Sequence, residues 1–150
     1  MEELRLTALD EQDLSVISAH LQDAVILVGD MKFTPARNQF AIVANRFDWE
    51  HSENGRGDGQ PFQRRRTGVH FNRVSAARAQ NIRQGEDAAV LELLSITFEP
   101  AELPSGTILL TFAGGGTLKL DVECIEAQMS DMGPVWETPS KPEHDLGDQA

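Results

Sequence analysis

The residues best suited to chemistry lie in and around residues 62–83. That segment contains six arginines and no acidic residue. A guanidinium group binds a carboxylate or a phosphate through paired hydrogen bonds, so clustered arginines predict a site for an anion. An aromatic and a histidine nearby could add contacts to such a site. The candidate binding residues are Trp49, Arg64, Arg65, Arg66, His70 and Arg73.

The strand expected at residues 64–73 would divide these arginines between its faces. Successive side chains of a strand alternate, so Arg64 and Arg66 would share one face, and Arg65 and Arg73 the other. A single anion could then meet all of them only across a bend. The alternative is that the arginines neutralise an acidic surface and shield a strand edge.

The sequence contains two tryptophans, whose roles are considered separately. Trp49 stands in a polar stretch beside Phe47. It is either an exposed contact residue or a side chain that folds back over the end of the sheet. Trp136 follows Gly133 and Pro134, and we expect it to dock the C-terminal segment.

The remaining reactive side chains show no catalytic or ligating pattern. None of the four histidines stands at a recognisable ligand spacing from another histidine, a cysteine or a carboxylate. Cys124 continues the alternation of Leu118, Leu120 and Val122, so we expect it to be a buried small hydrophobe on the inward face of a strand. The sequence predicts no metal site, no cofactor and no catalytic residue.

The composition of the chain limits the classes of partner that the protein is expected to bind. The 150 residues carry a formal charge of −11, and residues outside 62–83 carry −17. Such a chain repels polyphosphates at long range, which disfavours nucleic acid. The sequence has no bilayer-length apolar run, no signal peptide and a single cysteine. These features predict a cytoplasmic protein without a membrane partner.

One helix and several strands would position the arginines. A helix is expected over residues 11–22, capped by Asp10 and carrying an apolar stripe of Leu14, Ile17 and Leu21. Residues 24–33 and 39–46 read as strands, and residues 86–93 as a short helix. Residues 94–126 alternate as a three-stranded antiparallel meander.

The two halves of the chain resemble each other at an offset of 65. Met31 and Phe33 correspond to Ile96 and Phe98, and each half would be a helix followed by three strands. The first half uses the long connection 47–66 where the second uses three glycines. Connections of this length are usually functional or disordered. Coincidence is the alternative to duplication.

The expected fold class is α+β, with mainly antiparallel β meanders, an N-terminal helix and a probable αβββ duplication. The meanders would form a sandwich or an open barrel, since neither can cover its own apolar face. A pleckstrin-homology-like sandwich is compatible by analogy. We expect one globular domain over residues 1–136 and a loose tail over residues 137–150.

Several stretches together resemble an uncharacterised family of small alphaproteobacterial proteins, known only as a domain of unknown function. The resemblance implies a bacterial cytosolic protein and carries over no activity, cofactor or catalytic residue. The stretches are Leu9-Asp10 with Leu14, Ser18-Ala-His-Leu-Gln-Asp-Ala24, Asn45-Arg-Phe-Asp-Trp-Glu50, Arg64-Arg-Arg66 with His70-Phe71, Val122-Glu-Cys-Ile-Glu126, Trp136-Glu-Thr138 and His144-Asp-Leu146.

The leading expectation is a non-catalytic binding or regulatory module for a protein or a small anionic ligand. RNA or single-stranded nucleic acid, bound through residues 64–83 with Trp49 or Phe62 stacking on bases, is the second possibility. An enzyme whose catalytic groups converge from distant positions is the third.

Overall fold

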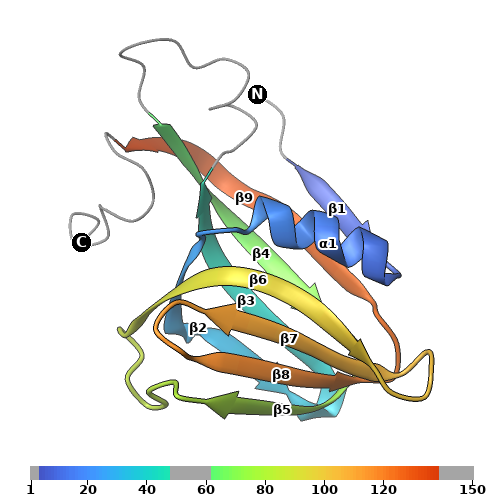
Figure 1. Ribbon diagram of the computed structural model, residues 1–150. Helices are drawn as coiled ribbons and strands as arrows, with labels where there is room; N and C mark the ends of the chain where they lie inside the picture. The colour runs from blue at the N-terminus through green and yellow to red at the C-terminus, as the bar shows by residue number, and fades with distance from the viewer. Residues whose placement is uncertain (1–3, 48–61, 139–150) are drawn as a thin grey trace.

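The computed structural model describes the backbone of residues 4–47 and 62–138 (Figure 1). In this part of the chain, nine strands form one antiparallel sheet in the order β1-β9-β4-β3-β2-β6-β7-β8-β5. A single α-helix, α1 (Glu11–His20), and one 3₁₀ turn, η1 (Pro35–Arg37), accompany it. The strands are β1 (Arg5–Ala8), β2 (Val25–Thr34), β3 (Gln39–Phe47), β4 (Phe62–Phe71), β5 (Val74–Gln80), β6 (Val90–Pro100), β7 (Gly106–Phe112), β8 (Thr117–Val122) and β9 (Ala127–Thr138).

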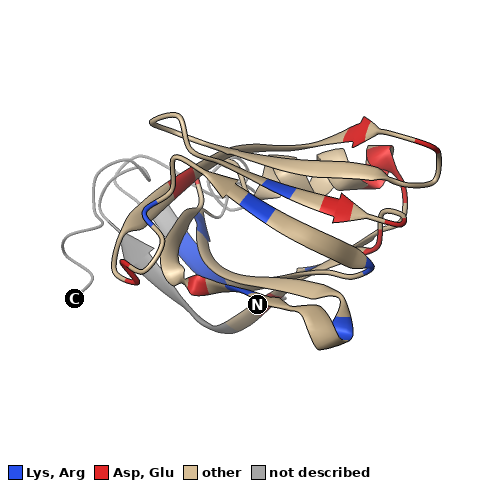
Figure 2. Ribbon diagram, turned by 90° about the horizontal axis from the view of Figure 1, so that it is seen from below, with Lys and Arg blue, Asp and Glu red and all other residues tan. Residues whose placement is uncertain are grey.

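The sheet folds over on itself at the junction of β2 and β6. These two strands pair only between residues 25–27 and 90–92. Beyond that junction, β1, β9, β4, β3 and β2 form one wing, and β6, β7, β8 and β5 form the other (Figures 1 and 2). Apolar side chains from both wings meet in one core, including Ile42, Phe71, Leu110 and Leu120. Burying this shared face is what holds the two wings together.

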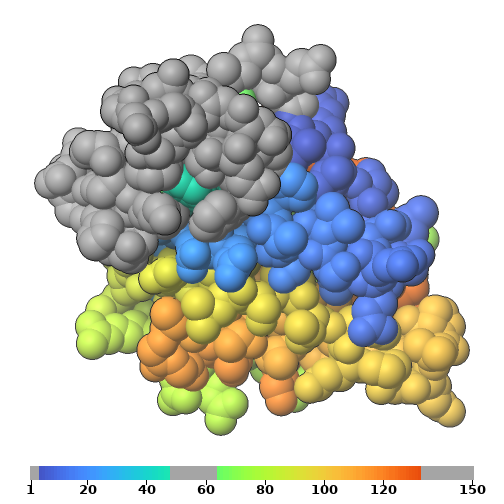
Figure 3. Space-filling model, turned by 45° about the horizontal axis from the view of Figure 1, so that its top comes forward, coloured from blue at the N-terminus to red at the C-terminus, as the bar shows by residue number. Residues whose placement is uncertain are grey.

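The helix α1 forms as its sequence predicts. The Asp10 carboxylate accepts a hydrogen bond of 2.7 Å from the Asp13 backbone N–H, which caps the first turn. Leu14, Ile17 and Leu21 lie on one face and are buried. That face packs against β6, as the adjacent blue and yellow surfaces of Figure 3 show. No helix in the described residues is long and apolar enough to cross a membrane.

The predicted C-terminal meander is also present as β6, β7 and β8. In β7 and β8 every second residue is buried, so one face lies on the core. Gly114 and Gly115 have φ of +87° and +97°, a backbone conformation that favours glycine, and they turn the chain between these strands. The three glycines are therefore a turn, as expected.

The strand order is symmetric about the β2–β6 pair. Strands β3 and β4 follow β2 outward on one side, and β7 and β8 follow β6 on the other. The next strand of each half then crosses over: β5 pairs with β8, and β9 pairs with β4. Each wing is thus completed by a strand from the other half of the chain.

The short helix predicted at residues 86–93 is wrong. Residues 86–89 form a turn, and residues 90–93 are already part of β6. The backbone carbonyls of the turn are used by β2 instead: the Gly29 N–H donates to Asp87 O, and the Val28 N–H to Ala89 O, both at 2.9 Å. Pairing with β2 leaves these carbonyls unable to accept bonds within a helix.

The inward strand position predicted for Cys124 is also wrong. Strand β8 ends at Val122, and Cys124 lies half-buried in the bend that follows. The chain turns here because the Glu123 N–H donates to Arg73 O, 3.0 Å away, at the corner between β4 and β5. The turn breaks the alternation, and Ile125 enters the core instead.

Candidate functional site

Five buried polar side chains lie on β3, β4 and β9, near the end of the first wing where β3 finishes and β4 begins. Arg46 lies opposite Arg65, and Thr67 lies opposite Asp131. All four are buried, as is Arg64. We refer to Arg46, Arg64, Arg65, Thr67 and Asp131 as the arginine cluster.

The carboxylate of Asp131 is the centre of the cluster. Arg46 donates to both of its oxygens, from Nε to Oδ1 and from Nη2 to Oδ2, each at 2.9 Å. The Thr67 hydroxyl donates to Oδ1 at 2.8 Å, and the Leu4 backbone N–H donates to Oδ2 at 2.9 Å. Arg65 Nε lies 3.9 Å from Oδ2. One carboxylate thereby joins β3, β4, β9 and the residue before β1.

These contacts fix the charge of Asp131. Burial of the carboxyl group raises its pKa, but hydrogen bonds from Arg46, Leu4 and Thr67 and the positive charge of Arg46 act in the opposite direction. Their sum holds the pKa of Asp131 below its ordinary value of 3.8. The group is an anion at neutral pH and can anchor arginines around it.

Arg64 and Arg65 are both buried although they are consecutive. The register of β4 with β9 shifts between Arg64 and Arg66, and the extra residues lie on β9, between Met132 and Trp136. The pairing of β4 with β3 has no shift there: Arg64, Arg65 and Arg66 lie opposite Phe47, Arg46 and Asn45. Arg64 donates from Nη1 to the Asn45 carbonyl oxygen at 3.1 Å. This regular pairing agrees with the prediction that Arg64 and Arg66 share a face, opposite Arg65.

The other candidate residues lie elsewhere. Arg66 and His70 are exposed, on the face of β4 that points away from the core. Arg73 is at the corner between β4 and β5, 3.5 Å from Glu126 and 4.0 Å from Glu123. Trp49 lies outside the described residues. Of the five candidates within the described residues, Arg64 and Arg65 are buried, and the Asp131 carboxylate lies near Arg65.

Sequence reasoning missed Arg46, Thr67 and Asp131, although two of them carry a detectable signal. Arg46 continues the inward series Phe40, Ile42 and Ala44, and Asp131 continues Ala127 and Met129. A charged residue at an inward position of an alternating strand indicates a buried partner of opposite charge. The partnership itself joins positions 85 residues apart, so no local pattern could reveal it.

The arrangement is suited to binding rather than to proton transfer. Guanidinium groups stay protonated at every physiological pH, and the Asp131 carboxylate is held as an anion by its donors. In the described residues no group of three or more His, Cys, Asp or Glu is placed to hold a metal ion. The cluster places guanidinium groups, which carry fixed positive charge, close to one buried carboxylate.

Comparison with known proteins places the chain in a family but supplies no activity. No curated protein and no solved structure matches it. The resemblance to a domain of unknown function is confirmed by a family model that matches residues 4–144. The chain belongs to the family described as "Protein of unknown function (DUF2948)".

Proposed function

We propose that the protein is a non-catalytic binding module whose ligand presents a carboxylate or phosphate group, on a small molecule or on a partner protein. The observation that carries the proposal is the burial of Arg46, Arg64 and Arg65 at one end of the first wing. Bidentate recognition of a planar or tetrahedral anion requires guanidinium groups whose orientation is fixed.

The contacts within the cluster supply that fixed orientation. Asp131 holds Arg46 through two hydrogen bonds, and Arg65 Nε lies 3.9 Å from the same carboxylate, within range of an ion pair. Arg64 is aligned by the Asn45 carbonyl. Donors held in this way lose little entropy when an anion binds.

The same geometry favours one anionic group over a nucleic-acid strand. A strand needs a continuous basic groove, usually with aromatic platforms. The six arginines of residues 62–83 are instead dispersed: two are buried, Arg66 faces outward, and Arg73, Arg78 and Arg83 pair with acidic residues. The net charge of −11 opposes a polyphosphate as well.

The test is a titration of the full chain with pyrophosphate and with citrate, followed by amide chemical shifts and by thermal shift. We expect saturable perturbations of residues in β3, β4 and β9. Arg65→Lys keeps the charge but removes the planar fork, so it should weaken binding by about tenfold, equivalent to about 1.4 kcal/mol. Arg66→Lys, the same change on the outward face, is the matched control.

Two results would remove this proposal. Equal affinity of the Arg65→Lys and Arg66→Lys variants would place the anion outside the cluster. Absence of saturable binding of both anions, together with recovery of the same proteins from a lysate by wild type and Arg65→Lys, would leave the cluster a purely structural joint.

We also propose that the fold arose by internal duplication, with strands β2–β5 and β6–β9 as the two copies. The support is the strand order, which is symmetric about β2 and β6 and exchanges the fourth strand of each copy. Superposition of residues 24–46 on residues 89–113 in an experimental structure should bring Phe33 onto Phe98 and Ile42 onto Leu110. Opposite strand directions or inverted faces in that superposition would mean coincidence.

A further inference from the structure

The helix α1 and the connection of residues 81–89 occupy corresponding places in the symmetric strand order. The helix precedes β2 and packs on β6, whereas the connection precedes β6 and lies on β2. On β6, the strand against which the helix packs, Ile96 and Phe98 are 3% and 8% exposed. The equivalent residues of β2, Met31 and Phe33, are only partly buried.

A hollow remains beside β2, because the connection of residues 81–89 covers less of β2 than α1 covers of β6. It has a volume of about 350 Å³. Its floor reaches the core at Phe40 and Leu118, which are 5% and 3% exposed. Phe33 stacks on Phe40 with ring centroids 6.5 Å apart and forms one wall. The hollow is lined by Val28, Gly29, Met31, Phe33, Phe40, Ala77, Ala79, Ile82, Gln84, Gly85, Asp87 and Leu118.

The mouth of this hollow carries one charge. Asp87 is the only ionisable residue among those that line it. Asp87 lies against β2 at Gly29, where an added Cβ would stand 2.7 Å from the Asp87 Cβ. Within the described part of the chain the Asp87 carboxylate has no ion pair.

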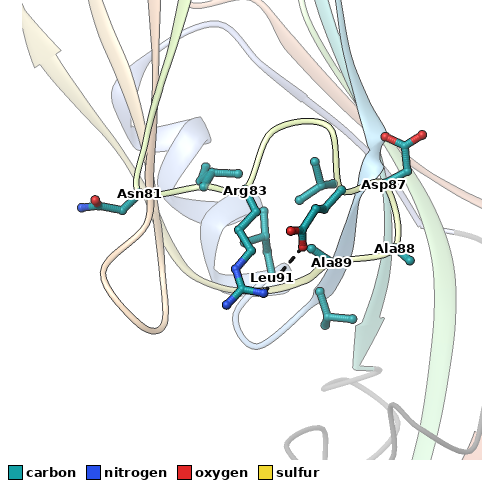
Figure 4. Close-up of a pocket in the computed structure, with 10 residues that line it drawn as sticks. Asn81, Arg83, Asp87, Ala88, Ala89 and Leu91 are labelled. Carbon is teal, nitrogen blue, oxygen red and sulfur yellow. Dashed lines mark ion pairs between the residues drawn. The ribbon is translucent and has the colours of Figure 1, made fainter.

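The neighbouring basic residue does not neutralise Asp87. Figure 4 shows the Asp87 carboxylate directed away from Arg83, across the connection. Arg83 pairs instead with Glu86, 3.6 Å away, in an adjoining open hollow of about 710 Å³. Asp87 lies on the border of the two hollows, and in the smaller one no basic residue accompanies it.

The geometry points to a binding site for a small amphipathic cation, with an apolar body in the hollow and a protonated amine at Asp87. A volume of about 350 Å³ is at the lower end of the range of ligand pockets, which fits a small molecule. The apolar body would cover Met31 and Phe33 as α1 covers Ile96 and Phe98. The amine would supply a counter-ion to Asp87 in place of water.

The probe is octylammonium, titrated into the full chain at pH 7 and followed by amide chemical shifts, with octanol and octanoate as matched ligands. We expect saturable binding of octylammonium with shifts at residues 31–33, 77–79 and 82–87. Octanol, which has the same tail and no charge, should bind about three- to fivefold more weakly, and octanoate more weakly still.

Two pairs of variants test the two parts of the site. Asp87→Asn should lower the affinity for octylammonium by about three- to fivefold and leave that for octanol unchanged, whereas Glu86→Gln should change neither. Ala79→Leu should fill the hollow and abolish binding of both ligands. Gln80→Leu, the same side chain on an exposed position of β5, should preserve it.

Melting curves of the variants separate loss of the hollow from loss of the fold. Unchanged octylammonium binding in folded Ala79→Leu would overturn the site, and equal binding of all three octyl compounds would overturn the role of Asp87. If Ala79→Leu does not fold, loss of the preference for octylammonium over octanol in Asp87→Asn decides instead. These ligands and variants do not involve the arginine cluster, so either proposal can fail alone.

Discussion

At the scale of single residues, Asp131 is the side chain whose loss should matter most. The side chains of Asp131 and Arg46 are each 1% exposed. Two buried charges are tolerated only while each satisfies the other. Asp131 also accepts from Thr67 and from the Leu4 backbone, so one side chain links the first wing to the beginning of the chain.

We predict that Asp131→Asn lowers the free energy of unfolding by about 3–5 kcal/mol, as for other broken buried pairs. The amide NH₂ would face the donors of Arg46 or Leu4, and Arg46 would lose its counter-ion. Asp121→Asn is the control, because its pair with Arg78 at 2.7 Å is partly exposed and should contribute below about 1 kcal/mol. Denaturant titrations measure both. If the two variants lost equal free energy of unfolding, Asp131 would contribute no more to stability than a partly exposed carboxylate does.

Asp131 also predicts a particular acid dependence of stability. Its pKa is below 3.8 in the folded chain and returns to the ordinary value on unfolding, so its ionised form favours the fold. This contribution is complete above the unfolded pKa and is lost as the pH falls through the folded one. We expect the stability of Asp131→Asn to fall less steeply than that of wild type below about pH 4. Parallel pH profiles of the two proteins would contradict this assignment.

The bend after β8 gives a prediction that separates two adjacent residues. Ile125 is 7% exposed and belongs to the core, whereas Cys124 is half-buried outside the strand. Ile125→Asp should unfold the protein or lower its stability by several kcal/mol, because a charge would enter the core unpaired. Cys124→Ser should cost less than about 1 kcal/mol. Thermal melts of the two variants would decide, and the reverse order would restore the inward position for Cys124.

At the scale of elements, local patterns predicted what local interactions determine. The cap at Asp10, the stripe of α1 and the alternation of β7 and β8 arise within a few residues, and all three were recognised. The bulge of β9 between Met132 and Trp136 depends on register with β4, and the connection of residues 81–89 depends on bonds to β2. Both lie beyond the reach of a local pattern. The connection predicted over residues 47–66 is shorter, because β3 ends at Phe47 and β4 begins at Phe62, and residues 48–61 lie outside the described residues.

The hairpin of β6 and β7 leaves no room for a side chain at Gly106, whereas β4 leaves more room at Gly68. A Cβ at Gly106 would stand 2.5 Å from Glu99 O, which is backbone and cannot yield. A Cβ at Gly68 would meet only the Met132 Sδ, 3.2 Å away at the end of a flexible side chain. We predict that Gly106→Ala costs about 1–3 kcal/mol and Gly68→Ala less than about 1 kcal/mol. Chemical denaturation tests the difference, and similar costs would show that the hairpin relaxes.

At the scale of the whole molecule, the crossed strands make the two halves depend on each other. Strand β5 belongs to the first half of the chain but pairs, among the described strands, with β8 alone, and β9 of the second half inserts between β1 and β4. The core likewise draws side chains from both wings. Neither half can bury its apolar face without the other, so the symmetric strand order does not describe two independent domains.

We therefore predict that the chain cannot be divided into two folded parts, although it can be cut. A break between Gly85 and Glu86 falls in an exposed connection. Fragments 1–85 and 86–150 should each lack dispersed amide signals alone, because β4, β5, β8 and β9 each lose at least one neighbouring strand. Mixing them in equal amounts should restore the spectrum of the intact protein, since every strand then finds its neighbour. A fragment that folds alone with native-like shifts would show that one wing is self-sufficient, and failure of the mixture to refold would show that the connection of residues 81–89 must be covalently intact.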